Sequence, residues 1–330
     1  SDIHLIVDEW HSLLADYGFK DAVIDKLIQS FSEYKQVIGL TGTYLPVPHP
    51  HRRVKVTQHR DEIPVTIVSY NHLWSAIIEQ VEARPEKTHF ISLYDKSKRL
   101  DNLQALLEKR GFETGEIMPF NSDTTDTEEV QKLMVQNVTK DDTEVVISTY
   151  VQGFSIKDTD YMVHIAPLPG AQHSPTDIAQ VAQRFRNTTD LPINLYWNFP
   201  PPEKSPPTDR EKYLSRQKTI ASKQIRQYRK DFNLGPEETL TSNQKIMISR
   251  HENTRKNDTE NESDKVNLVR NDLTPNDYQI NHNVYSVITE NIYKQRRHME
   301  KWLNRYGLTV EDEVACPFEL PEAQESSSAT

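Results

Sequence analysis

The sequence contains a single cysteine, Cys316, among its 330 residues. One cysteine excludes an intrachain disulfide framework and a cysteine-rich zinc site, and it is typical of a reducing compartment. No stretch approaches the roughly 18 to 20 consecutive apolar residues that a membrane-spanning helix needs, and the first residues lack the basic flank and apolar core of a secretion signal. These absences predict a cytoplasmic protein without a membrane partner.

Positive charge is also scarce, because 39 Lys and Arg residues stand against 49 Asp and Glu residues, for a net charge of −10. A chain of this charge does not hold nucleic acid through bulk electrostatics, so any such contact must be local. Hydrophobic residues make up 35%, enough for the cores of about two domains. A mean hydropathy of −0.72 predicts a substantial polar remainder beside those cores.

What the sequence does contain is a regular alternation of strand and helix patterns. Residues 3–7 and 37–40 read as buried strands around a helix at 20–31, which amounts to half of an α/β unit. Alternation with short connections predicts parallel, doubly wound sheets, in which ligands collect at the carboxyl ends of strands. The further strands are expected at 89–94, 113–117, 144–148, 161–165 and 193–197, and the further helices at 72–82, 97–110, 126–136 and 176–185.

A proline-dense segment at 200–207 predicts an extended linker. Beyond it we expect two basic helices, at 209–232 and 283–306, separated by an exposed loop at 250–265 that has almost no apolar residues. The predicted domains are residues 1–60, a remnant of one lobe; 61–200, a complete lobe; 201–310, a helical extension; and 311–330, a disordered tail.

Two groups of candidate site residues follow the first two predicted strands. Asp8 and Glu9 come directly after the strand at 3–7, where one carboxylate can hold a hydrated Mg²⁺ and its neighbour can orient or deprotonate water. Thr41 and Thr43 follow the strand at 37–40, so their hydroxyls are expected near the same carboxylates. Taken alone, acidic residues after a strand are common and Thr41-Gly42-Thr43 is an ordinary turn.

Two further groups lie downstream. Ser148 and Thr149, with Gly153 shortly after, end a predicted strand, where small residues let a phosphate or nucleic-acid backbone approach closely. Gln180-Val181-Ala182-Gln183-Arg184-Phe185-Arg186 ends a helix with two arginines, whose planar forks match phosphate oxygens. The alternative for Arg184 and Arg186 is a basic helix end that the helix dipole favours.

The order of these groups resembles that of the superfamily 2 helicases. Asp8-Glu9-Trp10-His11 is similar to the DExH motif II, Thr41-Gly42-Thr43 to motif III and the strand at 89–94 to motif IV. Residues 149–155 resemble motif V and 180–186 resemble motif VI. The last is closest to the form in herpesvirus origin-binding-protein-like helicases, although Gln183 stands in place of the usual glycine. The resemblance covers about the first 200 residues.

The resemblance implies a RecA-like α/β fold, ATP and Mg²⁺ as cofactors, and a nucleic-acid partner, with DNA favoured over RNA and with possible replication proteins. It implies that Asp8 coordinates Mg²⁺ through water and that Glu9 is the catalytic base. It also implies that His11 and Gln180 couple the two lobes through the nucleotide, and that Thr41 and Thr43 link hydrolysis to motion. In the second lobe, Ser148, Thr149 and Gly153 are implied to lie near the nucleic-acid and nucleotide surfaces. Arg184 and Arg186 are implied to contact the γ-phosphate.

The phosphate-cradling pattern Gly-x-x-x-x-Gly-Lys-Ser/Thr does not occur in the chain. Since that loop precedes motif II in the family, we expect sequence upstream of Ser1 and no ATP hydrolysis by this chain alone. The leading hypothesis is the C-terminal portion of a helicase or translocase in replication of a phage, plasmid or mobile element. One alternative is a non-catalytic binding module that uses the basic helices, and another is an unrelated doubly wound protein with chance matches.

Overall fold

The computed structural model describes residues 2–41, 45, 47–48, 54, 62–93, 97–121, 123–149, 155–157, 160–167, 175–185, 191–200, 210–235, 238–258 and 268–317. By its internal contacts the chain divides into two compact units, each built from two separate stretches of sequence. The first unit comprises Ser1–Lys55 with Lys204–Asn291, and the second comprises Val56–Glu203 with Ile292–Thr330.

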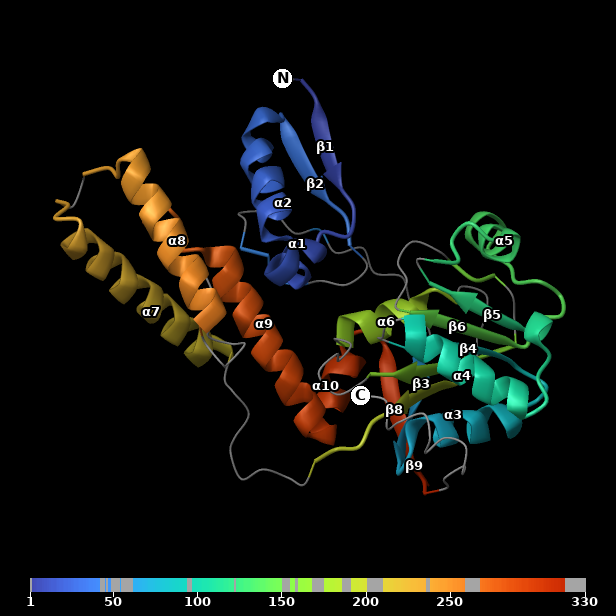
Figure 1. Cartoon of the computed structure of the whole chain (residues 1–330). Helices are drawn as coiled ribbons and strands as arrows, with labels where there is room; N and C mark the ends of the chain where they lie inside the picture. Colours follow the sequence, from blue (N-terminus) through green and yellow to red (C-terminus); the bar gives the residue numbers. More distant parts are fainter. Residues whose placement is uncertain are drawn as a thin grey trace. The chain divides into compact units, whose positions relative to one another are not determined.

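The second unit is built on a seven-stranded sheet of order β5-β6-β4-β7-β8-β3-β9, in which all paired strands are parallel (Figure 1). The predicted α/β fold class with parallel sheets is confirmed by this topology. Its strands are β3 (Ile63–Tyr70), β4 (Thr88–Leu93), β5 (Ile117–Phe120), β6 (Val145–Thr149), β7 (Tyr161–Ala166), β8 (Ile193–Tyr196) and β9 (Leu308–Cys316). Its helices are α3 (Leu73–Glu82), α4 (Ser97–Lys109), α5 (Glu128–Gln136), α6 (Pro175–Gln183) and α10 (Arg296–Asn304).

The central strands of the second unit are buried along nearly their whole length. All six residues of β7 and all four of β8 are buried, as expected for central parallel strands covered on both faces. On one side, Ile77 of α3 and Leu103 of α4 pack into a cluster with Ile91 and Ile147 of the sheet, and all four are fully buried. Burial of this kind stabilises by about 1.5 to 3 kcal/mol per large aliphatic side chain.

A chain of buried hydrogen bonds crosses the same sheet. His89 Nε2 lies 3.0 Å from the carbonyl oxygen of Arg84, and His89 Nδ1 lies 2.9 Å from His164 Nε2. His164 Nδ1 lies 2.8 Å from the hydroxyl of Tyr196. Because the carbonyl only accepts, His89 donates to it, His164 donates to His89 and Tyr196 donates to His164. Every ring nitrogen is satisfied when both imidazoles are neutral, and burial lowers the pKa of both His89 and His164.

Acid is therefore expected to destabilise the second unit. The folded-state pKa values of His89 and His164 lie below the ordinary value of 6.5, so the unfolded chain binds more protons as the pH falls below that value. This contribution to stability is complete above pH 6.5 and is lost on acidification. Urea unfolding of the wild type and of His164→Gln between neutral and mildly acidic pH checks it. We expect a shallower pH dependence in the variant, and equal slopes would contradict the assignment.

Two details of the second unit correct the sequence prediction. Residues 114–116 form a turn of 3-10 helix rather than the start of a strand, because the side chains of Glu113 and Glu116 cap it reciprocally. The tail predicted from residue 311 begins instead inside β9, which pairs with β3 at the edge of the sheet. β9 carries exposed acidic residues at 311–313, a composition that discourages further strand addition at an edge. Residues 318–330 of the predicted tail lie outside the described residues.

The first unit joins a small α/β segment to long helices. β1 (His4–Val7) pairs in parallel with β2 (Gln36–Gly39), and between them run α1 (Ser12–Ala15), α2 (Tyr17–Ser30) and the 3-10 turn Phe31–Glu33. The helices α7 (Arg210–Asp231), α8 (Ser242–Asp258) and α9 (Asp277–Lys294) come from the second stretch of sequence (Figure 1). The domain boundaries predicted from the sequence stay predictions.

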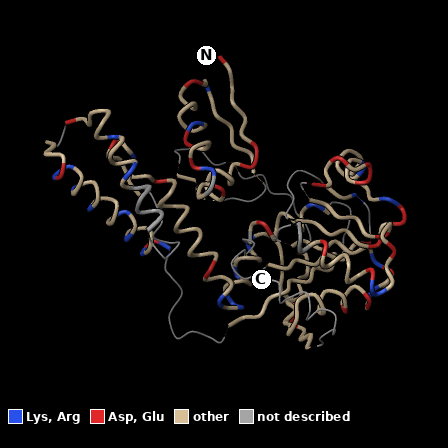
Figure 2. The backbone as a smooth tube through the Cα atoms, in the orientation of Figure 1, with Lys and Arg blue, Asp and Glu red and all other residues tan. Residues whose placement is uncertain are grey.

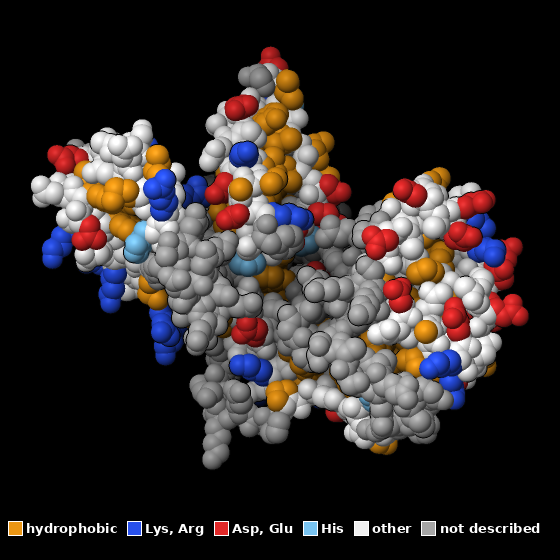
Figure 3. Space-filling model, viewed as in Figure 1, with side chains coloured by type: hydrophobic (Ala, Val, Ile, Leu, Met, Phe, Trp, Pro, Cys, Tyr) orange, Lys and Arg blue, Asp and Glu red, His pale blue; other side chains and the backbone are white. Residues whose placement is uncertain are grey.

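The two strands of the first unit are not buried, in contrast to the prediction. Exposed and half-buried residues alternate along β1, and most residues of β2 are exposed. Ile6 in β1 is 62% exposed, and Leu40, directly after β2, is 49% exposed. Val23 of the adjoining helix α2 is also exposed, at 68%. Hydrophobic side chains gather on this part of the surface in Figure 3. An apolar run predicts a strand but does not reveal whether a second layer covers it.

The helical part of the chain also differs from the prediction in two places. Helix α8 extends to Asp258, so the polar segment predicted as a loop from residue 250 is helical as far as it is described. The single helix predicted at 283–306 is two helices, α9 and α10, because Gln295 adopts an extended conformation between them. Among the described residues, no helix combines enough length and apolar character to cross a membrane.

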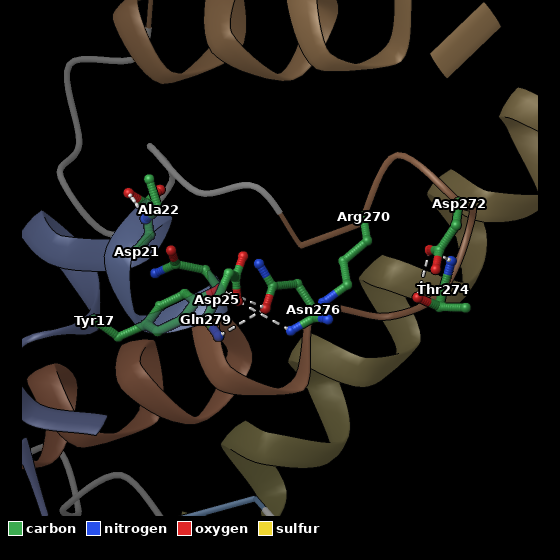
Figure 4. Close-up of polar contacts among 9 residues, drawn as sticks. All are labelled: Tyr17, Asp21, Ala22, Asp25, Arg270, Asp272, Thr274, Asn276 and Gln279. Carbon is green, nitrogen blue, oxygen red and sulfur yellow. Dashed lines mark hydrogen bonds and ion pairs between the residues drawn. The ribbon is translucent and has the colours of Figure 1, made fainter. Parts of the chain in front are cut away.

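A polar network fastens the two stretches of the first unit together (Figure 4). The buried hydroxyl of Tyr17 lies 2.8 Å from Asp25 Oδ1 and 3.2 Å from Asn276 Oδ1. Arg270 donates to the same carboxylate at 3.2 Å. Burial raises the pKa of Tyr17, so the hydroxyl keeps its proton and donates. Residues near the two ends of the sequence thus form one polar cluster, beside an apolar cluster in which Tyr278 stacks on Tyr17.

Candidate functional site

The candidate catalytic residues Asp8 and Glu9 lie where β1 ends. Asp8 is exposed, and its Oδ1 accepts a hydrogen bond from the backbone N–H of Glu9 at 2.9 Å. Glu9 adopts a left-handed conformation with φ of 50°, uncommon for a residue with a side chain and costing on the order of 1 kcal/mol or more. This turn lets the backbone N–H of Trp10 pair with the carbonyl of Leu40 at 2.8 Å. The carboxylates are therefore presented at the carboxyl edge of two parallel strands.

His11 connects the two predicted motifs of the first unit. Its Nδ1 lies 2.8 Å from Thr41 Oγ1 and 3.3 Å from Glu9 Oε2. The ring is only 2% exposed, and burial lowers its pKa although Asp16 and Asp8 oppose the shift. Two oxygens face Nδ1, and one belongs to an acceptor-only carboxylate, so the geometry favours the tautomer with the proton on Nδ1. A neutral His11 then places a donor between Glu9 and Thr41.

The predicted proximity of Thr41 to the acidic residues holds through this contact with His11. Thr41 is half-buried directly after Leu40, whose backbone N–H donates to the carbonyl of Val7 at 2.8 Å. Thr43, and Gly42 between the two threonines, lie outside the described residues. The segment that resembles motif III is thus described only at Thr41.

Trp10 and Gly39 hold this corner in place, a role that the sequence reasoning missed. The indole of Trp10 is buried and stacks on Phe31, with ring centroids 5.8 Å apart. Another neighbour is Gly39, where an added Cβ would lie 2.4 Å from the indole. The indole therefore needs a residue without a side chain in β2. The pairing of a bulky residue at one strand exit with a glycine at the other was the available signal.

In the second unit, the predicted residues Ser148 and Thr149 end β6. Ser148 is buried and its hydroxyl donates to the carbonyl of Thr149 at 2.6 Å, while Thr149 is half-buried. This hydrogen bond makes Ser148 part of the local backbone structure. Gly153, predicted beside them, lies outside the described residues.

Ile156, which follows β6 in the sequence, lies beside Arg184, the first residue after helix α6. The backbone N–H of Ile156 donates to the carbonyl of Arg184 at 2.8 Å, and Ile156 bridges Phe185. Gln180 is buried in α6, whereas Arg184 is half-buried just past the helix. The residue that directly follows the segment resembling motif V therefore contacts the segment that resembles motif VI. Arg186 lies outside the described residues.

The predicted site residues thus form two groups. Asp8, Glu9, His11 and Thr41 are together in the first unit; Ser148, Thr149, Gln180 and Arg184 belong to the second. Among the described residues, no three His, Cys, Asp or Glu side chains are placed to hold a metal ion. Mg²⁺ at nucleotide sites is held by one or two carboxylates, water and the phosphates, and the exposed Asp8 fits that demand by itself.

The comparisons with known proteins concern the fold alone. No protein-family model matches the chain, and no curated protein matches it. Among solved structures, S. cerevisiae Dbp5 bound to RNA and ADP BeF3 is 16% identical, with a TM-score of 0.41 over 58% of this chain and 52% of that one. The yeast DEAD-box splicing factor Prp28 is 15% identical, with a TM-score of 0.33 over 71% of this chain and 55% of that one.

The chain spans about half the length of each of these two structures. Similarity at this level carries no argument about activity, substrate or partner. The case for a function rests on the chain's own residues and on the contacts among them.

Proposed function

We propose that the chain is part of an ATP-dependent nucleic-acid helicase or translocase, with Asp8 and Glu9 in its hydrolytic site. The observation that carries the proposal is the contact of one buried imidazole, that of His11, with both Glu9 and Thr41. Thr41 follows Glu9 by 32 positions in the sequence, and the two meet at adjacent strand ends. In the proposed motor, this contact would link Glu9 to the neighbouring strand exit.

The chemistry proposed for the first unit uses its two carboxylates, of which Asp8 is exposed and Glu9 is half-buried. Asp8 would hold Mg²⁺ through water, and the bound ion would supply charge neutralisation for phosphate oxygens. Glu9 orients the attacking water and accepts its proton, a role worth roughly 10²- to 10⁴-fold in rate. His11 contacts both Glu9 and Thr41 through Nδ1, so a movement of Glu9 would be transmitted to Thr41. Thr43 would extend that link.

In the second unit we propose that Arg184, together with Arg186, stabilises charge on the γ-phosphate, and that Gln180 and Gly153 contribute to the nucleotide site. The hydrogen bond between Ile156 and Arg184 supports this, since Ile156 directly follows the segment that resembles motif V and Arg184 belongs to the segment that resembles motif VI. Ser148 and Thr149 are proposed to face nucleic acid. The preference for DNA over RNA and the place in replication rest on the motif VI likeness.

The isolated 330-residue chain is expected to release no phosphate from Mg·ATP at a steady rate. Its sequence has no Gly-x-x-x-x-Gly-Lys-Ser/Thr loop to cradle the β and γ phosphates. A continuous phosphate-release assay on the purified chain, with and without DNA or RNA, checks this. A steady rate that Glu9→Gln abolishes would show that the chain holds a complete site.

A binding module without catalysis is the second candidate function, favoured by the charge on helix α7. The two functions are separated by measuring nucleic-acid-stimulated ATP hydrolysis in the longest natural protein that carries these residues. Hydrolysis that depends on Glu9 supports the motor. Binding without hydrolysis supports the module.

A further inference from the structure

Helix α7 carries a concentration of positive charge in a chain that is otherwise acidic. Its 22 residues include eight Lys or Arg and two acidic residues, a net charge of +6. The chain as a whole has a net charge of −10. Figure 2 shows Lys and Arg at close intervals along α7, and Figure 3 shows them projecting from one side of it.

Most of this charge lies on one stripe of the helix. At 3.6 residues per turn, five exposed cations fall within an arc of about 80° and extend over about 27 Å of helix length. We call these residues the α7 stripe: Lys212, Arg216, Lys223, Arg226 and Lys230. The opposite side of the helix, with Gln217, Ala221 and Tyr228, is buried.

The α7 stripe differs from an ordinary solvated helix face. Such a face intersperses Glu with Lys at spacings of three or four residues, and these pairs stabilise the helix by about 0.2 to 0.5 kcal/mol each. In α7 the acidic residues are Glu211 and Asp231, at the two ends. The stripe instead places cations at those spacings, as with Lys212 and Arg216 or Arg226 and Lys230, which destabilises the helix by similar amounts.

Binding of a polyanion would relieve this repulsion. The surroundings of the stripe distinguish between two such partners, a lipid surface and nucleic acid. An amphipathic helix that lies on a lipid surface needs an available apolar face. The apolar face of α7 is occupied, since Ala221 and Tyr228 pack in a cluster with Ile248 of α8 and Ile280 of α9. The stripe itself contains no aromatic side chain for stacking on bases, so it matches phosphates rather than bases.

We propose that the α7 stripe is a sequence-independent binding surface for the phosphate backbone of nucleic acid. Arg216 and Arg226 offer forked donors to phosphate oxygens, and the lysines add point charges along the same line. The surface lies outside the candidate hydrolytic site and does not require its activity. It supplies the local contact that an acidic chain needs to hold nucleic acid.

The test compares two variants of the full chain that each lose four positive charges. The stripe variant carries Lys212→Gln, Arg216→Gln, Lys223→Gln and Arg226→Gln. The control variant carries Lys26→Gln, Lys35→Gln, Lys109→Gln and Lys140→Gln, all exposed positions that do not belong to α7. Gln has a helix propensity close to that of Lys and Arg, so circular dichroism should be unchanged.

Binding is measured without nucleotide, by fluorescence anisotropy of labelled duplex and single-stranded DNA of about 20 nucleotides, over a series of salt concentrations. We expect the stripe variant to lose at least about tenfold in affinity, and its salt slope on the duplex to fall by up to about 3.6, because each of the four lost phosphate contacts contributes about 0.9 to that slope. The control variant should keep the wild-type affinity and slope.

Equal losses in both variants would overturn the proposal, because they would reflect net charge alone. Unchanged binding by the stripe variant would also overturn it. Binding of phosphatidylserine vesicles in place of DNA would assign the surface to a membrane and reject the nucleic-acid partner. Since no nucleotide is present, these outcomes stand apart from success or failure of the proposed ATPase.

Discussion

Glu9→Gln is expected to lower nucleic-acid-stimulated ATP hydrolysis by about 10²- to 10⁴-fold in the longest natural protein that carries this chain. Glutamine keeps the length and shape of the side chain but does not accept a proton from water. The left-handed backbone at residue 9 and the contact toward His11 are compatible with the amide. The loss should therefore fall on kcat, with little change in nucleotide affinity.

The matched control is Glu33→Gln, which removes an exposed carboxylate from the 3-10 turn of the same unit. Phosphate release under saturating ATP and nucleic acid gives kcat, and equilibrium titration with a fluorescent nucleotide gives affinity. Equal rates for Glu9→Gln and wild type would reject Glu9 as the base. An equal loss in both variants would point to a general effect of charge.

Gly39→Ala is expected to destabilise the first unit by about 1 to 3 kcal/mol, the usual cost of overpacking. The new methyl carbon would lie 2.4 Å from the indole ring of Trp10. Trp10 has little space to yield, because it is buried and stacks on Phe31. Movement of the indole would also displace its neighbours Glu9 and His11, so the same change should impair the candidate site.

Hydrogen exchange read by mass spectrometry checks this locally, through the protection of peptides that cover β1 and β2. Gly115→Ala is the control, because an added methyl group there meets nothing within 4 Å. We expect faster exchange around residues 4–40 in Gly39→Ala and none of that change in Gly115→Ala. Identical protection in the two variants would mean that Trp10 repacks without cost.

The sequence predicted the centre of the second unit well and its margins poorly. The strands at 88–93 and 161–166 are buried at the centre of the sheet, and apolar residues recur along both of them. β9 lies at the sheet edge and contains three consecutive acidic residues, which removes the apolar signal. Helix α8 is very polar, and helical spacing cannot be recognised where there are few apolar residues to show it.

The candidate site was predictable where it depends on strand ends. Asp8 and Thr41 follow neighbouring parallel strands, and that order alone predicts that they lie near each other. The burial of His11, and hence its neutral state, depends on Trp10, Leu13 and Leu14 around it in the fold. The resemblance of Asp8-Glu9-Trp10-His11 to a motif identifies these residues in the sequence. The contacts of His11 Nδ1 with Glu9 and Thr41, in contrast, follow only from the fold.

The polar network of Tyr17, Asp25 and Arg270 has a consequence for how the protein is made. Tyr17 meets Asn276 across 259 positions of sequence, and Asp25 meets Arg270 across 245. Contacts of such separation form slowly and late. During synthesis, the contacts of Tyr17 and Asp25 with residues 270–276 form only after those residues have emerged, and the pairing of β3 with β9 forms only after residue 316 has emerged. Fragments that end near residue 200 should therefore be cleaved readily by proteases and bound by chaperones, although they contain most of the candidate site residues.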